Sequence, residues 1–402
     1  MSDFFQTGVV ATLHRLGQRR IEDYEDELVR FSRTSPMALV LPALYTEFGT
    51  EAMNRILAEL PKVPYLKQVV LALGNATAEQ FADARKQLAG VHKNARVIWI
   101  EGERLQRLFD TLKENQLDPG SPGKGRACWI AYGYVLASGQ AKIIGLHDCD
   151  IVNYSREMLA RLLHPIANPN VDFEFGKGFY ARYTSKLHGR VTRLFVTPFV
   201  RTLKEIFGHL PFLVYFDSFR YPLAGEFAMD VELARVNRIP ADWGLEVGVL
   251  AEVYRNCSLK RVCQVDIAEN YEHKHQALSA DNAQAGLMRM ATDIAKTFFR
   301  MLAAEGAVLD NGTFRTIQTK YVRMGEDTIT RYHADAMING LEFDRHEEEV
   351  AVQAFARAIA LAAEDFAKDP LGIPLIPNWN RVAAALPDFF SKLELAVEED
   401  NA

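Results

Sequence analysis

Cysteine is scarce in this sequence. The 402 residues include only Cys128, Cys149, Cys257 and Cys263, and no two of them form a CxxC pair. A chain this long would gain only a sparse disulfide framework from so few cysteines, which are typical of reduced thiols in a cytosol. We therefore expect a cytoplasmic protein.

Long apolar runs and an excess of positive charge are also absent. Uninterrupted apolar runs reach only about the length of 37–45, well short of the roughly 20 residues that cross a bilayer, and the N-terminus lacks the apolar segment of a signal peptide. The 46 Lys and Arg against 52 Asp and Glu give a net charge of −6. No strong field attracts a polyanion, so we expect neither nucleic acid nor a membrane as a partner.

The sequence does contain short apolar runs that alternate with helical patterns. Runs at 37–41, 68–73, 95–100 and 141–146 have the length and continuity of buried strands, and the stretches 77–88 and 125–137 are typical of helices. This alternation predicts an α/β fold with a doubly wound, mostly parallel sheet. Ligands bind such sheets at the carboxyl ends of the strands.

The rest of the chain is more mixed. We expect one or two helices over 4–33, a strand within 171–180 and helices over 191–207. The chain after 281 is predicted to be mostly helical, with breaks at 311–312 and 370–377. The predicted organisation is an N-terminal helical segment (1–36), an α/β domain (37–280) and a C-terminal helical extension (281–402).

The sharpest local motif is Asp148-Cys149-Asp150, directly after the apolar run 141–146. A turn at a strand end lets both carboxylates converge on a cation, and hard oxygen ligands of this kind suit Mg²⁺ or Mn²⁺ carrying a diphosphate. The alternative is a solvated turn, because aspartate is common in turns.

A Gly/Pro-rich loop precedes a predicted helix at Gly120-Ser-Pro-Gly-Lys-Gly125. Exposed backbone N–H groups and Lys124 before a helix N-terminus make a reasonable anion site. The loop lacks the spacing and the hydroxyl of a Walker A motif. An ordinary connecting loop is the alternative interpretation.

A third motif is Tyr271-Glu-His-Lys-His275. Its histidines could supply one metal ligand and one polar contact, since imidazole is a frequent ligand of divalent metals. On spacing alone, an exposed polar segment is the favoured interpretation.

Together with other segments, these motifs resemble a known family. The segments are, in chain order, Leu41-Pro42-Ala43-Leu44 with Glu47, 122–125, 148–150, Gly189-Arg190-Val191-Thr192, 222–227, 243–248 and His273. Over about 37–280 the chain is similar to the glucosyl-3-phosphoglycerate synthases, which are retaining glycosyltransferases of the GT-A type. The resemblance implies that fold, a divalent metal (Mg²⁺ or Mn²⁺), a nucleoside diphosphate glucose as donor and 3-phosphoglycerate as acceptor.

The resemblance also implies roles for individual residues. Donor contacts fall to Pro42, Ala43, Leu44, Glu47, Lys124, Asp148 and Leu223. The acceptor's anionic groups would meet Gly189, Arg190, Thr192 and His275, and the metal would bind Asp150 and His273. Asp150, Lys124 and Glu246 form the implied catalytic set. The alternatives are an ordinary ion pair for Arg190 and a surface carboxylate for Glu246.

The implied activity is transfer of glucose to 3-phosphoglycerate with retention, in the biosynthesis of the compatible solute glucosylglycerate. The alternatives are a mannose donor, a glycerate or other small acceptor on the same fold, a sugar nucleotidyltransferase, or a non-catalytic sensor of sugar nucleotides. We expect a homodimer. Because every matched motif precedes residue 281, we also expect the extension to serve assembly or stability rather than chemistry.

Overall fold

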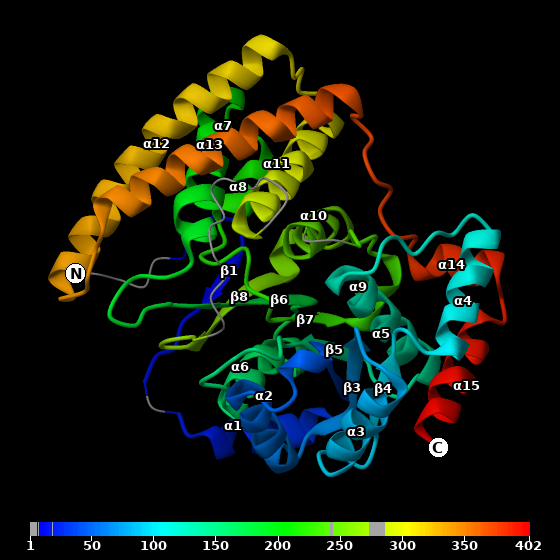
Figure 1. The fold of residues 1–402 in the computed structure, drawn as a ribbon. Helices are drawn as coiled ribbons and strands as arrows, with labels where there is room; N and C mark the ends of the chain where they lie inside the picture. The colour runs from blue at the N-terminus through cyan, green and yellow to red at the C-terminus, as the bar shows by residue number, and fades with distance from the viewer. Residues whose placement is uncertain (1–5, 7, 18, 242–243, 273–285) are drawn as a thin grey trace.

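The protein is built around a twisted sheet with helices on both faces (Figure 1). The computed structural model describes residues 6, 8–17, 19–241, 244–272 and 286–402. Within them the sheet has eight strands in the order β1-β8-β6-β7-β5-β2-β3-β4. The strands are β1 (Ala11–Leu13), β2 (Met37–Leu44), β3 (Leu66–Gly74), β4 (Ala95–Trp99), β5 (Ile143–Leu146), β6 (Phe175–Tyr180), β7 (Phe227–Asp230) and β8 (Val262–Ala268).

Helices connect and cover these strands. Up to β8 they are α1 (Ile21–Phe31), α2 (Glu51–Glu59), α3 (Ala78–Ala89), α4 (Glu103–Glu114), α5 (Lys124–Ser138), α6 (Arg156–Ala167), α7 (Thr197–Phe207), α8 (Pro211–Asp217), α9 (Val231–Val236) and α10 (Leu245–Asn256). After β8 follow α11 (Gly286–Ala304), α12 (Asn311–Ile338), α13 (Arg345–Lys368), α14 (Trp379–Ala385) and α15 (Phe389–Asn401). Short 3-10 turns are η1 (Tyr45–Glu47), η2 (Leu60–Lys62) and η4 (Leu259–Arg261), and η3 (Val191–Val196) is a π-helical turn.

The predicted fold class is confirmed, with two local differences. β7 runs antiparallel to both of its neighbours, β5 and β6, whereas the other pairings are parallel. The N-terminal segment is not wholly helical, because β1 pairs with β8 before α1 begins. The two strands concerned, β1 and β7, are only three and four residues long. Their pairing partners are distant in sequence, so local periodicity carries little signal for them.

Alternation along β2 explains why the sheet has two cores. Ala38 and Val40 point into a core that includes Trp129 of α5, while Leu39 and Leu41 point into the opposite one. Successive side chains of a strand face opposite ways, so a strand covered on both faces is apolar at every position. This leaves the carboxyl end of the strand as the place for polar chemistry.

The helices after β8 share the first of these cores. Phe199 of α7 meets Phe298 and Phe299 of α11 edge to face, at ring-centroid distances of 5.8 and 6.0 Å. Tyr321 of α12 donates a hydrogen bond from its hydroxyl to the Leu194 carbonyl, 2.7 Å away. α12 and α13 lie side by side over α7 (Figure 1). The extension therefore packs against the α/β unit through a continuous apolar contact.

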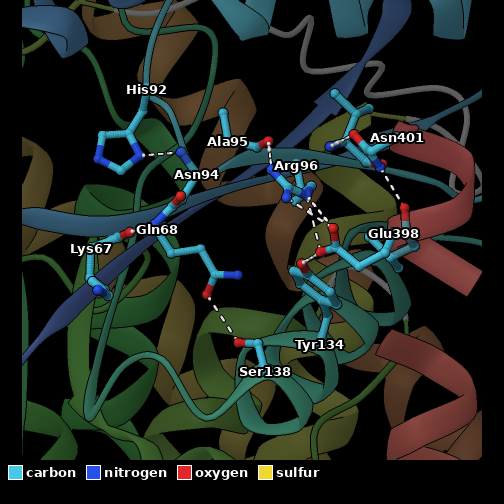
Figure 2. Close-up of polar contacts among 12 residues, drawn as sticks. Lys67, Gln68, His92, Asn94, Ala95, Arg96, Tyr134, Ser138, Glu398 and Asn401 are labelled. Atoms are coloured by element: carbon cyan, nitrogen blue, oxygen red, sulfur yellow. Dashed lines mark hydrogen bonds and ion pairs between the residues drawn. The ribbon is translucent and has the colours of Figure 1, made fainter. Parts of the chain in front are cut away.

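The chain then returns to the far edge of the sheet. An irregular stretch leads to α14 and α15, which cover α5 and β4 (Figure 1). Figure 2 shows how α15 is attached: Glu398 accepts hydrogen bonds from Arg96 Nε at 2.9 and 3.0 Å and one from the Tyr134 hydroxyl. The Asn401 side-chain amide donates a hydrogen bond to the Val97 carbonyl at 2.9 Å and accepts one from the Val97 backbone N–H at 3.0 Å. A side-chain amide thus satisfies backbone groups of the edge strand β4.

None of the described helices combines the length and the apolarity needed to cross a bilayer.

Candidate active site

A large cavity opens at the carboxyl edge of the sheet. Its volume is about 1840 Å³. The residues singled out from the sequence that line it are Pro42, Ala43, Leu44, Glu47, Lys124, Asp148, Asp150, Gly189, Arg190, Thr192, Leu223 and Glu246. These residues come from well-separated parts of the chain, and the fold brings them to one cavity. His273 and His275, the remaining predicted site residues, lie outside the described residues.

Lys124 lies at the centre of the charged groups. It is the first residue of α5, and its ammonium contacts Asp148 Oδ1 at 2.6 Å and Glu246 Oε1 at 2.9 Å. Burial alone would lower the pKa of Lys124, but the two carboxylates outweigh burial and raise it well above its usual value. Lys124 is therefore a permanent cation that joins α5, the end of β5 and the start of α10.

Asp150 faces the same cavity with a perturbed carboxyl group. Burial, followed by the charge of Asp148, raises the pKa of Asp150 to about 7. Two neighbouring carboxylates that resist ionising together are the environment that a divalent cation relieves. Their oxygen chemistry fits Mg²⁺ or Mn²⁺. No group of three or more His, Cys, Asp or Glu side chains within the described ranges is arranged to hold a metal ion, and His273, the other predicted metal ligand, lies outside those ranges.

The loop before α5 is shaped for close approach. Gly123 is the N-cap residue of α5 and has no side chain that could accept hydrogen bonds from the first backbone N–H groups of the helix. An uncapped helix N-terminus beside a lysine favours anions. A Cβ at Gly125 would lie 1.9 Å from the Pro240 carbonyl oxygen, so only glycine fits between α5 and the chain before α10.

A second glycine fits against the Asp148 carboxylate. A Cβ on Gly225 would lie 2.2 Å from Asp148 Oδ2. Any larger residue would displace that carboxylate, which Lys124 holds. This contact explains why a glycine occurs in the segment 222–227, which is indicated from sequence only by the family resemblance.

Behind Gly225 lies a buried network that sequence reasoning missed. Glu226 accepts hydrogen bonds from the hydroxyls of Tyr180 and Tyr271, at 2.8 and 2.6 Å, and the two tyrosine rings stack 3.8 Å apart. Burial, with Asp148 next in effect, raises the pKa of Glu226. Lys177, also fully buried, donates to the Ala224 carbonyl at 2.5 Å, and burial lowers its pKa to about 8. Isolated polar residues next to apolar runs gave no pattern that could have identified this network.

Other residues that line the cavity carry cationic and hydroxyl groups. Arg182 donates to the Tyr221 hydroxyl at 3.0 Å, and its Nε is buried without a hydrogen-bond partner among the described residues. The Thr192 hydroxyl is likewise buried and lacks a partner there. Gly189 has φ of +72°, a conformation that favours glycine. Unpaired buried donors beside a cavity are suited to an anionic ligand.

Arg190 is already paired in this structure. Its Nε contacts Glu348 Oε1 at 2.9 Å and its Nη2 contacts Glu347 Oε2 at 2.7 Å, both from α13. The ion-pair alternative considered for Arg190 therefore describes a real contact. Because Arg190 also lines the cavity, the ion pair and a role in binding do not exclude each other.

Two residues of the 147–150 segment are structural. His147 is fully buried, neither ring nitrogen has a hydrogen-bond partner among the described residues, and burial lowers its pKa to about 4. It is therefore neutral near pH 7. Cys149, like the other three cysteines, is a buried free thiol.

Comparison with characterised proteins adds independent information. No family model matches the chain. The glucosyl-3-phosphoglycerate synthase of Persephonella marina is 50% identical over 402 residues, covering 100% of both chains. That of Methanococcoides burtonii is 42% identical over 363 residues, covering 89% of this chain and 88% of its own.

Solved structures agree in fold. The glucosyl-3-phosphoglycerate synthase of Mycobacterium tuberculosis, in complex with Mn²⁺, UDP-glucose and phosphoglyceric acid, is 23% identical with a TM-score of 0.53, covering 75% of this chain and 89% of that chain. The same enzyme with Mn²⁺, UDP and glucosyl-3-phosphoglycerate is 22% identical with a TM-score of 0.52, covering 75% of this chain and 90% of that one. At this level of identity the likeness shows the fold alone.

Proposed function

The chain belongs to the glucosyl-3-phosphoglycerate synthase family, and on this basis we infer that it transfers glucose from a nucleoside diphosphate glucose to 3-phosphoglycerate. Two relatives that bear that name are 50% and 42% identical to this chain, and their alignments cover 100% and 89% of it. The structural observation that carries the assignment is the ammonium of Lys124, paired with Asp148 and Glu246 beside an uncapped helix N-terminus. This arrangement provides a cation for a diphosphate next to carboxylates for sugar hydroxyls and a metal.

We propose that the donor occupies the half of the cavity lined by β2 and α5. Pro42, Ala43, Leu44 and Glu47 would hold the base and ribose, and Lys124 would meet the diphosphate. Asp150, with His273 from outside the described residues, would hold a divalent cation, and Asp148 would lie beside it. Structural relatives contain Mn²⁺ or Mg²⁺ together with UDP or UDP-glucose. When bound, the cation supplies charge neutralisation for the departing diphosphate.

We propose that the acceptor occupies the other half, around Gly189, Arg190 and Thr192. Backbone N–H groups, a guanidinium and an unpaired buried hydroxyl together suit a molecule with a phosphate and a carboxylate. His275 would complete this subsite from outside the described residues, and Leu223 lines the cavity on the donor side.

We propose retention by front-side attack. The acceptor hydroxyl oxygen bonds to the anomeric carbon as the bond from that carbon to the diphosphate breaks. The electron pair leaves with the diphosphate, and the hydroxyl proton passes to a departing phosphate oxygen. Glu246 lines the cavity but is held by Lys124 at 2.9 Å, so we assign it to glucose hydroxyls rather than to nucleophilic attack.

We also propose a cytoplasmic location and a homodimer. The four buried free thiols support the location. Large exposed apolar side chains in the extension, such as Ile338 and Leu371, support self-association. Analytical ultracentrifugation of the purified protein measures the assembly directly.

The function is tested by following the nucleotide product. Purified protein is incubated with Mg²⁺, 3-phosphoglycerate and UDP-, GDP- or ADP-linked glucose or mannose, and released nucleoside diphosphate and pyrophosphate are measured separately. We expect nucleoside diphosphate with a glucose donor, dependent on 3-phosphoglycerate. A parallel incubation contains glucose 1-phosphate and a nucleoside triphosphate, and release of pyrophosphate there would identify a nucleotidyltransferase. In another, glycerate replaces 3-phosphoglycerate, and preferential use of glycerate would identify it as the acceptor.

A further inference from the structure

Three consecutive glutamates, 347–349, lie near the start of α13, and two of them contact Arg190 of the proposed acceptor subsite. Arg190 Nε pairs with Glu348 at 2.9 Å and its Nη2 with Glu347 at 2.7 Å. Glu349 instead pairs with Arg345 on the surface of the same helix, also at 2.9 Å. A segment more than 150 residues away from Arg190 in sequence thus holds two of its guanidinium nitrogens.

Glu348 also holds a second arginine. Its Oε2 lies 2.8 Å from Arg193 Nη1, and Arg193 Nε donates to the His188 carbonyl at 2.8 Å. One buried carboxylate of α13 therefore holds Arg190 and Arg193, and Arg193 in turn holds the His188 carbonyl. Ser185, just before the stretch from 188 to 193, is also attached to the chain that leads into α13, because its carbonyl accepts a hydrogen bond from the backbone N–H of Glu342 at 2.8 Å.

The two glutamates differ in exposure. The Glu348 side chain is 6% exposed and its partner Arg193 9%, whereas the Glu347 side chain is 55% exposed and lines the cavity. A buried charge pair is costly to break because each partner would be left unpaired in a poorly solvated place. An exposed pair contributes little and exchanges readily for another anion.

We propose that Glu348 is a positioning residue for the acceptor and that Glu347 is a displaceable counter-ion of Arg190 that the acceptor's anionic group replaces. This rests on the proposed function, in which Arg190 meets 3-phosphoglycerate. Glu348 fixes the direction of the guanidinium through its Nε edge. Glu347 neutralises the Nη2 side until an anion arrives. The extension thereby contributes to acceptor binding, a role that its sequence does not indicate.

The glutamates offer a matched experiment, because Glu347→Gln, Glu348→Gln and Glu349→Gln each remove the same charge from one helix turn. If charge alone mattered, both of the first two variants would bind the anionic acceptor more tightly. We expect opposite signs: Glu348→Gln raises the KM for 3-phosphoglycerate about ten-fold or more, and Glu347→Gln lowers it about two- to five-fold. Glu349→Gln leaves it unchanged, and the donor KM stays the same in all three.

Several outcomes would overturn the proposal. These are a lower acceptor KM in Glu348→Gln, a higher one in Glu347→Gln, or an equal rise in the KM for both substrates in Glu348→Gln, which would indicate a general structural defect. Glu348→Asp keeps the charge and provides a second folded variant, and it should raise the acceptor KM while thermal unfolding stays near the wild type.

Binding separates this proposal from the function itself. Calorimetric titration of 3-phosphoglycerate into the full-length proteins reports affinity without turnover, and it should rank the variants in the same order. A wild-type protein that binds 3-phosphoglycerate but forms no glucosylated product would refute the function while still testing both glutamates. Variants that bind 3-phosphoglycerate with wild-type affinity would refute the glutamate roles while leaving the function intact.

Discussion

At the residue scale, the site consists of charges whose partners lie far away in sequence. Lys124 and Asp148 were identifiable because a loop and a strand end have local signatures. The pairing of Lys124 with Glu246 across 122 positions has no local signature. The same is true of Glu226, which is defined by hydrogen bonds from Tyr180 and Tyr271. Sequence patterns therefore indicated where chemistry occurs but not which polar residues support it.

Lys124→Met should remove the cation proposed to meet the diphosphate. We expect kcat to fall by about 10²–10³, with the Asp148 and Glu246 carboxylates left to repel each other. Steady-state kinetics measure the loss, and Lys86→Met, at an exposed position of α3, is the control for removal of a lysine. A kcat within a factor of about two of wild type would remove Lys124 from the catalytic set.

Asp150→Ala should abolish most turnover together with the response to added Mg²⁺ or Mn²⁺, because Asp150 is a proposed ligand of the cation. The expected drop in kcat is at least about 10³, comparable to the loss of strong electrostatic stabilisation. His273→Ala should behave in the same way. Metal titration of each variant provides the measurement, and wild-type turnover that persists in EDTA would contradict the metal requirement.

At the scale of elements, periodicity gave the β/α succession but not every strand. β2 to β5 each contain a short apolar run that local patterns reveal. β1 and β7 are strands because β8, β5 and β6 pair with them, which is a tertiary effect. The sequence predicts a break in the helical extension at 311–312, but these two residues are the first two of α12. The break lies just before them. There the Asp310 side chain caps the helix.

The attachment of α14 to α5 can be tested through one aromatic pair. The rings of Trp129 and Trp379 stack 4.0 Å apart, and Trp379 is fully buried. Trp379→Ala should lower the free energy of unfolding by about 3–5 kcal/mol, as measured by denaturant titration, while Trp379→Phe should cost less because it keeps part of the contact. A loss below about 1 kcal/mol for the alanine variant would mean that α14 contributes little to stability.

At the scale of the whole molecule, the extension is continuous with the core and reaches the site. Its helices share the apolar core that contains α5 and α7, and Glu347 and Glu348 contact Arg190. The roles proposed for Glu347 and Glu348 disagree with the expectation that the extension is dispensable for chemistry. That expectation stays a prediction until truncation tests it. It rested on the position of the recognised motifs, and ion pairs formed by single glutamates leave no motif in a sequence.

Truncation after Ser279 should accordingly remove both stability and acceptor binding. The cut would expose Phe195 and Phe199, which pack against Phe355 and Phe298, so we expect aggregation by light scattering. Any soluble fraction should bind 3-phosphoglycerate at least about ten-fold more weakly than the full chain. A monodisperse truncated protein with full activity would show that the extension serves neither purpose.

The most direct test of the central claim is the chemical identity of the product. Purified protein is incubated with Mg²⁺, a nucleoside diphosphate glucose and 3-phosphoglycerate, and the product is examined by mass spectrometry and by the anomeric proton signal in NMR. The account predicts the mass of glucosyl-3-phosphoglycerate, with the α configuration of the donor retained and one nucleoside diphosphate released per product. A β-linked product would contradict retention, and free glucose or glucosylglycerate as the main product would contradict 3-phosphoglycerate as the acceptor.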